Sequence, residues 1–316
     1  MAPPLGGRLT DRLGYGAGPM VPYEPRRDST IRLPDGRALA YAEWGDPDGR
    51  PVFFFHGMPG SRSFVPDPEA AAQEHVRLIS ADRPGMGRSD PQPGHSIGDW
   101  PADVVALADA LGLDRFGVVG WSAGTCYVFA CAAVIPERLT GAVGTTSAAA
   151  MRYLFDRDEE IRERLIDDEE REILEILHER GREAAERRLA DEAADWVRGI
   201  AEQPEQMVEG DDDAGDEWFL EDVARRTAFA ESFREAVRQG AEAMAPQFVA
   251  QVAPWDFRLE DIAIPVHVWA GANDGITPPE RMRLVAERVP GVTFTVWDDV
   301  GHAGIAKYFG DVLREL

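Results

Sequence analysis

The stretch that decides the fold is Gly120-Trp121-Ser122-Ala123-Gly124, a G-x-S-x-G pattern directly after the apolar run 116–119. A helical pattern follows it, so the serine is expected at a sharp turn from strand to helix. Such a turn crowds the backbone of its central residue, and the flanking glycines relieve the crowding. It exposes the hydroxyl at a helix N-terminus, which favours developing negative charge. The pattern therefore predicts a nucleophilic serine; the alternative is a glycine-rich turn.

Apolar runs and helical patterns alternate on both sides of this motif. A continuous apolar run such as 52–55 suits a strand that is covered on both faces. The alternation predicts an α/β fold, a mostly parallel, twisted sheet of about eight strands with helices on both faces. The expected strands are 30–33, 38–44, 52–55, 76–81, 116–120, 140–144, 264–270 and 292–297, and the expected helices are 97–111, 125–134, 279–288 and a short one after His302.

The alternation is interrupted between residues 152 and 254. Residues 152–245 hold 14 Lys and Arg against 30 Asp and Glu, a net charge of −16 out of −24 for the chain. Apolar residues recur there at helical spacing, as in Ile161 with Leu165 and Phe229 with Phe233, while 205–216 resembles a loop. We therefore expect an N-terminal arm at 1–28, an α/β core at 29–151 and 255–316, and an inserted all-helical cap at 152–254.

Composition restricts the class of protein. With 316 residues, 44% of them hydrophobic, the chain can bury a core, and its net charge of −24 argues against nucleic acid or an anionic membrane as partner. Residues 1–25 hold no signal-peptide apolar run, and Cys126 and Cys131, expected on one helix, do not suit a disulfide. We expect a cytoplasmic protein that acts on a small molecule; the sequence leaves the oligomeric state undefined.

A nucleophilic serine needs a base that takes its proton. Of the six histidines, His302 lies in the small-residue loop 300–304 directly after the last expected strand, where it can reach over the sheet edge. His302 is therefore the predicted base. His75, His95 and His178 are expected at the surface, and His267 is expected to pack within a strand.

The base must itself be oriented by an acid. Asp274 lies in the glycine-bounded turn 271–278 after an expected strand, where it would serve either as a turn or capping carboxylate or as the acid that fixes the tautomer of His302. Asp298 and Asp299 are alternatives, but they are too near His302 in sequence to reach it easily. Ser122, Asp274 and His302 are the predicted catalytic residues.

In the order Ser, Asp, His, the sequence resembles α/β-hydrolase fold proteins of the serine-nucleophile type over residues 30–316. The run 55–61 (FHGMPGS) resembles the family's turn after the third strand, and 82–89 (DRPGMGRS) resembles its Gly-rich loop after the fourth, interpreted as scaffold. The resemblance assigns the N–H groups of Met58 and Ala123 to an oxyanion hole. It also gives His56 a role in supporting the turn.

The resemblance implies a serine hydrolase that cleaves an ester, lactone or thioester of a partly hydrophobic small molecule through an acyl-enzyme, without metal or organic cofactor. The turn at 56–60 is also similar to the His-Gly-Gly-Pro-Gly of proline iminopeptidases, with Met58 replacing a glycine. Aminopeptidase activity is thus the first alternative, and a cofactor-independent lyase or haloperoxidase or a ligand-binding protein is the second. Trp121 is a candidate substrate-binding residue, and apolar cap residues such as Trp218, Phe219, Phe229 or Phe233 are expected to reach the pocket.

Overall fold

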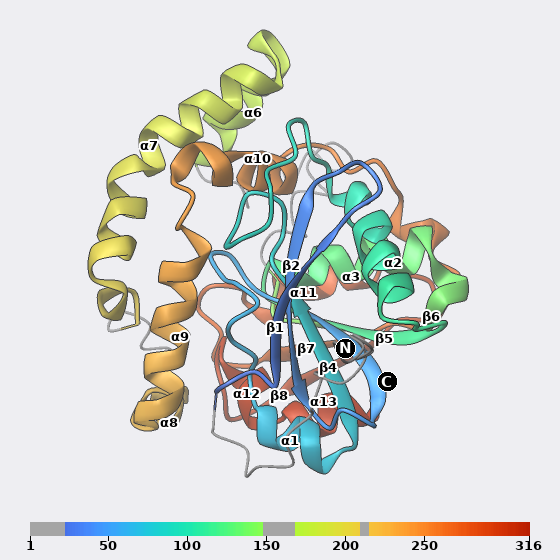
Figure 1. Ribbon diagram of the computed structural model, residues 1–316. Coiled ribbons are helices and arrows are strands. Elements are labelled where there is room, and N and C mark those ends of the chain that lie inside the picture. The colour runs from blue at the N-terminus through green and yellow to red at the C-terminus, as the bar shows by residue number, and fades with distance from the viewer. Residues whose placement is uncertain (1–22, 148–167, 209–214) are drawn as a thin grey trace, which may run out of the picture.

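The computed structural model describes residues 23–147, 168–208 and 215–316. In this part of the chain, eight strands form one sheet in the order β1-β2-β4-β3-β5-β6-β7-β8 (Figure 1). The pairs β1/β2 and β2/β4 are antiparallel and the remaining pairs are parallel, as expected. The strands are β1 (Arg27–Arg32), β2 (Ala38–Gly45), β3 (Arg50–Phe55), β4 (Val76–Ala81), β5 (Phe116–Trp121), β6 (Leu139–Thr145), β7 (His267–Gly271) and β8 (Thr293–Trp297).

The apolar run in β3 explains why helices cover both faces of this sheet. Successive side chains of a strand point to opposite faces. Phe53 and Phe55 accordingly belong to one buried cluster, whereas Val52 and Phe54 belong to another on the other face. Each face therefore needs its own layer of helices.

Core helices supply these two layers. One cluster includes side chains of α2 (Trp100–Ala110), α3 (Gly124–Val134) and α11 (Pro279–Ala286). The other includes side chains of α1 (Pro68–Gln73), α12 (Gly304–Lys307) and α13 (Phe309–Arg314). Short 3₁₀ turns lie at η1 (Ile97–Asp99), η2 (Pro136–Arg138) and η4 (Leu259–Asp261). The result is the predicted α/β sandwich of a sheet between helices.

The described residues 168–208 and 215–252, between β6 and β7, are mostly helical, and we call them the helical insertion. They form α6 (Asp168–Arg180), α7 (Arg182–Glu202), η3 (Pro204–Met207), α8 (Glu217–Glu221), α9 (Val223–Ala236) and α10 (Ala241–Val252). Figure 1 shows α6 to α9, coloured yellow-green to orange, along one side of the core. The expected boundary at residue 151, the Ile161/Leu165 pair and the Asp211–Asp213 run lie outside the described residues.

The insertion is anchored on the loop at 82–89 of the core. The side-chain amide of Gln239 donates hydrogen bonds to the carbonyls of Gly87 (3.0 Å) and Ser89 (2.7 Å). A Cβ on Gly85 would lie only 1.9 Å from the carbonyl oxygen of Ala243 in α10, so only glycine permits this contact. The loop after β4 is therefore a docking point for the insertion as well as scaffold.

Element boundaries differ from expectation by up to three residues, most clearly at the starts of two strands. β1 begins at Arg27 rather than at residue 30, and β7 begins at His267 rather than at 264. Pro265 has no N–H to donate to a ladder, which explains the later start of β7. No helix within the described ranges is long and apolar enough to cross a membrane.

Candidate active site

Ser122 occupies a sharp turn between β5 and α3. Its φ is +54°, in the left-handed region that non-glycine residues rarely adopt, and its N–H donates to the carbonyl of Thr145 at 2.9 Å. A Cβ on Gly120 would lie 2.5 Å from the carbonyl oxygen of Gly124, and one on Gly124 would lie 2.0 Å from that of Phe55. The two glycines are thus required for the turn, and the expected crowded conformation of Ser122 is observed.

His302 and Asp274 are brought together from the loops after β8 and β7. His302 Nδ1 lies 3.0 Å from Asp274 Oδ2. The other carboxylate oxygen accepts from the N–H groups of Ile276 (3.0 Å) and Thr277 (2.6 Å), and the Thr277 hydroxyl donates to Oδ2. Asp274 is 3% exposed and His302 is 8% exposed, so water competes little for these bonds.

Opposing effects act on the charge of Asp274. Burial alone would raise its pKa, because it disfavours the charged carboxylate. The hydrogen bond and charge of His302, together with the bonds from Thr277, outweigh burial and hold the pKa of Asp274 below its ordinary value. Asp274 is therefore ionised at neutral pH. The rival Asp299 instead pairs with Lys307 and the hydroxyl of Tyr308 at the surface.

The turn after β3 lies against the serine. A Cβ on Gly57 would be 3.3 Å from the Cβ of Ser122, which places the backbone of 57–58 beside the hydroxyl. In the described part of the chain, the N–H groups of Met58 and Ala123 are not among the backbone donors with a hydrogen-bonded partner. The assignment of these two amides to an oxyanion hole stays a prediction.

A buried arginine stabilises this turn through hydrogen bonds to its backbone carbonyls. The guanidinium of Arg83, 1% exposed, donates to the carbonyls of His56 and Gly57, the latter at 2.7 Å, and lies 4.9 Å from the centre of the Tyr127 ring. Burial and the charge of Arg83 hold the pKa of His56 well below its ordinary value, so His56 is neutral. Its Nδ1 lies 2.9 Å from the Gly57 carbonyl oxygen, as expected of a turn-supporting residue.

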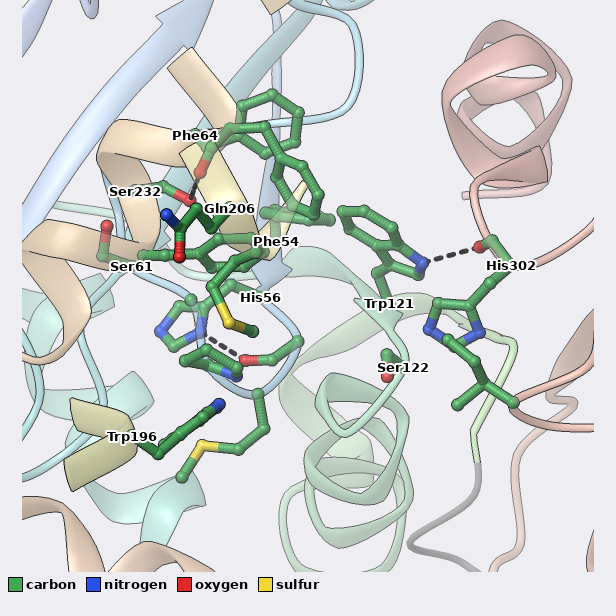
Figure 2. A pocket seen from close by; sticks show the side chains of 18 residues that line it. Phe54, His56, Ser61, Phe64, Trp121, Ser122, Trp196, Gln206, Ser232 and His302 are labelled. Atoms are coloured by element: carbon green, nitrogen blue, oxygen red, sulfur yellow. Dashed lines mark hydrogen bonds between the residues drawn. The ribbon is translucent and has the colours of Figure 1, made fainter. Parts of the chain in front are cut away.

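Ser122 and His302 open into a cavity of about 400 Å³ between the core and the insertion. Figure 2 shows the labelled side chains around it, with the indole of Trp121 bonded to the backbone oxygen of His302. The described residues that line it include many apolar and a few polar groups and no carboxylate. They are Phe54, His56, Gly57, Met58, Pro59, Gly60, Ser61, Phe64, Trp121, Ser122, Trp196, Gln206, Met207, Phe229, Ser232, Phe233, Ile276 and His302.

The insertion contributes to this cavity largely as expected. Phe229 and Phe233 line it, whereas Phe219 packs behind them, 5.2 Å from Phe229 between ring centres. Trp218 is likewise not among the lining residues. Trp196 and Met207, which periodicity did not single out, also line the cavity. Trp121 both lines it and stacks on Phe229 at 5.4 Å.

The other histidines are distributed less simply than expected. His75 and His178 are exposed. His267 is partly exposed in β7, with Nδ1 3.1 Å from a carboxylate oxygen of Glu315. The surface assignment of His95 is wrong: it is fully buried, and its ring stacks against Tyr127 at 6.4 Å. Burial lowers the pKa of His95 to about 3. Its polar neighbours in the sequence concealed this packing.

Metal-ligand clusters and a disulfide are not found in the described residues. Within residues 23–147, 168–208 and 215–316, no group of three or more His, Cys, Asp or Glu residues is placed to hold a metal ion. Cys126 and Cys131 are both buried in α3 and are not disulfide-bonded, and burial raises the pKa of Cys131. Their surroundings are those of packing residues.

Comparison with known proteins identifies the family. Residues 50–306 match the model of the family described as alpha/beta hydrolase fold, and the chain belongs to that family. It is 40% identical over 97 residues to a non-heme chloroperoxidase of Streptomyces lividans (30% of this chain, 35% of that protein). It is also 29% identical over 126 residues to a proline iminopeptidase of Arabidopsis thaliana (39% and 33%).

The chain thus matches only about a third of the length of each of these two relatives. Among solved structures, a thermophilic esterase from Thermogutta terrifontis superposes with a TM-score of 0.63 over 92% of this chain and 97% of that one, at 23% identity. At this identity the likeness concerns the fold alone.

Proposed function

We propose that the protein is a serine hydrolase that cleaves an ester, lactone or thioester of a partly hydrophobic, uncharged small molecule. The observation that carries this proposal is the placement of Ser122 and of the Asp274-bonded His302 on one largely apolar cavity. Nucleophile, base and acid come from the loops after β5, β8 and β7, which end at the same edge of the sheet. Such convergence on a cavity is typical of an active site in an α/β sheet.

The proposed reaction is acyl transfer to water. The Ser122 hydroxyl attacks the substrate carbonyl carbon while His302 Nε2 accepts its proton, with Asp274 stabilising the imidazolium through Nδ1. The N–H groups of Met58 and Ala123 donate to the oxyanion of the tetrahedral intermediate, each contributing about 3 kcal/mol to transition-state stabilisation. His302 then protonates the leaving group and activates water to release the acyl group.

The cavity favours an uncharged acyl group over an N-terminal amine. A protonated amine in a cavity needs a negative partner, because burying an unpaired charge is costly. The described lining residues offer no carboxylate. Of the two carboxylates of α9 close in sequence to lining residues, Glu231 pairs with Arg234, and Glu235 pairs with Arg62 at 2.7 Å. This supports ester hydrolysis over the iminopeptidase activity named for one relative.

The experiment is a substrate panel with wild type and Ser122→Ala. p-Nitrophenyl esters from acetate to octanoate test the ester hydrolase, and proline 2-naphthylamide tests the aminopeptidase. We expect serine-dependent turnover of the esters and a preference for acyl groups longer than acetate. No turnover of any ester, together with no labelling of Ser122 by a fluorophosphonate, would reject the proposal.

Two matches to known proteins give reason to test two alternative activities in the same substrate panel. The match to a proline iminopeptidase makes turnover of proline naphthylamide the second candidate. The match to a non-heme chloroperoxidase calls for an assay of halide oxidation with added peroxide. If either activity exceeds ester hydrolysis in kcat/KM and depends on Ser122, that activity replaces the proposed one.

A further inference from the structure

The loop that carries His302 lacks regular structure of its own. It connects β8 to α12 over residues 298–303, and the small residues Gly301 and Ala303 flank His302. Asp274 fixes the ring of His302, but a bond to Nδ1 leaves the position of the backbone to be set by other contacts. Small residues restrict the backbone little, so the loop needs anchors from elsewhere in the fold.

One anchor comes from the helical insertion. Asp216, immediately before α8, directs both carboxylate oxygens at the loop: Oδ1 accepts the N–H of Gly301 at 2.9 Å, and Oδ2 accepts that of Ala303 at 2.7 Å. These are the amides on either side of His302. Asp216 is 4% exposed, so the bonds are shielded from water.

Its neighbour Gly215 makes this approach possible. Gly215 has φ +96°, and a Cβ there would lie 2.7 Å from the carbonyl oxygen of Asp299 and 3.2 Å from the side-chain nitrogen of Asn273. The segment 215–216 therefore lies directly against the loops that carry both His302 and Asp274. A second anchor comes from the core, where Trp121 Nε1 donates to the carbonyl of His302 at 2.9 Å.

We propose that Asp216 is a positioning residue for His302, through which the helical insertion holds the base over Ser122. This inference rests on the proposed function. The two carboxylates then position different parts of His302. Asp274 orients the imidazole ring, and Asp216 fixes the backbone from which the ring projects. A buried carboxylate is costly unless its oxygens accept hydrogen bonds, so Asp216 favours the single loop position in which both amides reach it.

Small errors in position have large kinetic effects. A displacement of about 1 Å of a reacting group can cost about 100-fold in rate. Loss of one Asp216 bond should therefore lower kcat, while KM changes little because Asp216 is not among the residues that line the cavity. A residue that only attached the insertion to the core would not be expected to lower kcat while leaving KM unchanged.

The test uses the full chain with Asp216→Asn and, as second variant, Asp216→Ser. Asparagine keeps the volume and one acceptor oxygen but turns an amide N–H₂ toward the other backbone N–H. The matched control is Glu221→Gln, which makes the same change on an exposed carboxylate of α8. Steady-state kinetics on p-nitrophenyl butyrate give kcat and KM, and circular dichroism checks the fold.

A spectroscopic readout is independent of turnover. The Nδ1–H of His302 bonded to Asp274 should give a downfield proton resonance in the NMR spectrum, assigned by its loss in His302→Gln. We expect Asp216→Asn to shift or broaden this resonance and to lower kcat by about 10- to 100-fold, with KM changed far less. Glu221→Gln should change neither quantity.

Several outcomes would overturn the inference. A folded Asp216→Asn with the wild-type resonance rejects it, whether or not kcat falls. If neither variant folds, Asp216 serves folding, and the positioning role is rejected. If wild type hydrolyses none of the esters, the proposed function fails, but the resonance still decides whether Asp216 positions His302.

Discussion

The core and the helical insertion contribute different side chains to a cavity that both of them line. The core supplies Ser122, His302, Asp274 and the two candidate oxyanion amides, each held by backbone or buried side chains. The insertion supplies aromatic and apolar surface, with Phe229 and Phe233 on α9 and Trp196 on α7. The proposed function therefore assigns reactivity to the core and selectivity to the insertion, and Asp216 is the residue through which the insertion contacts the loop that carries His302.

The largest effect tests whether reactivity resides in the core. Ser122→Ala should lower kcat for p-nitrophenyl esters by about 10⁴- to 10⁶-fold, by analogy with triad knockouts in subtilisin. Ser232→Ala is a matched control, because Ser232 also lines the cavity but its hydroxyl donates to the carbonyl of Phe229 at 2.8 Å. The control should retain near wild-type kcat; a similar loss in both variants would contradict the assignment.

The next effect concerns the acid that orients the base. Asp274→Asn should lower kcat by about 10⁴-fold, because an amide no longer favours the tautomer of His302 that can accept a proton on Nε2. Asp299→Asn, at an exposed carboxylate in the neighbouring loop, serves as control. Steady-state rates on one ester suffice, and an equal loss in the two variants would count against Asp274.

A smaller effect tests the selectivity assigned to the insertion. Phe229→Ala removes an aromatic wall of the cavity, and burial of such a side chain contributes about 1.5 to 3 kcal/mol. We expect kcat/KM for octanoate or phenylacetate esters to fall by about 10- to 100-fold, with acetate affected least. Val223→Ala, at a 63% exposed position of α9, is the control. An equal fall in kcat/KM for all esters would contradict the assignment of selectivity to the insertion.

The smallest effect concerns stability behind the site, where the core meets the insertion. His95 has a pKa of about 3 when folded, against an ordinary 6.5, because it is buried. Between these values the unfolded chain binds more protons than the folded chain, so stability falls as the pH drops below about 6.5. His95→Phe removes this dependence, and its loss of unfolding free energy from pH 7 to pH 5 should be smaller than that of wild type by about 2 kcal/mol.

Urea denaturation at the two pH values measures this difference. His178→Phe is the control, because His178 is exposed on α6 and should leave the pH dependence unchanged. An identical pH dependence in wild type and His95→Phe would show that the buried ring does not take up a proton on unfolding. Asp99 and Arg182, which contribute to the electrostatics of His95, remain in place in this variant.

Local patterns predicted the parts of the site that depend on short-range sequence. The strand, the paired glycines and Ser122 are adjacent in the chain, so the turn and its backbone conformation could be anticipated. His302 and Asp274 each follow an apolar strand, and parallel strands bring such loops to one edge. The sheet and its helical layers followed from the same alternation of apolar runs.

Other parts could not be read from neighbours in the sequence. Asp216 lies beside an acidic run that is typical of a solvated loop, and its partners are 85 and 87 residues further along the chain. Arg83 and His95 have polar or glycine-rich neighbours, although both are buried against Tyr127. Their burial is a consequence of tertiary packing against Tyr127, which no local period encodes.

The loop at 82–89 contacts both the turn after β3 in the core and the helical insertion. Arg83 reaches from it to the turn that carries Met58, and Gln239 of the insertion binds its carbonyls a few residues later. Arg83 and Gln239 are coupled through this backbone segment. The effects of substituting both residues on the free energy of unfolding should therefore not be additive. An evolving or engineered relative that exchanges its insertion would therefore need compensating changes in this loop, and selectivity could be altered independently of reactivity only at positions remote from it.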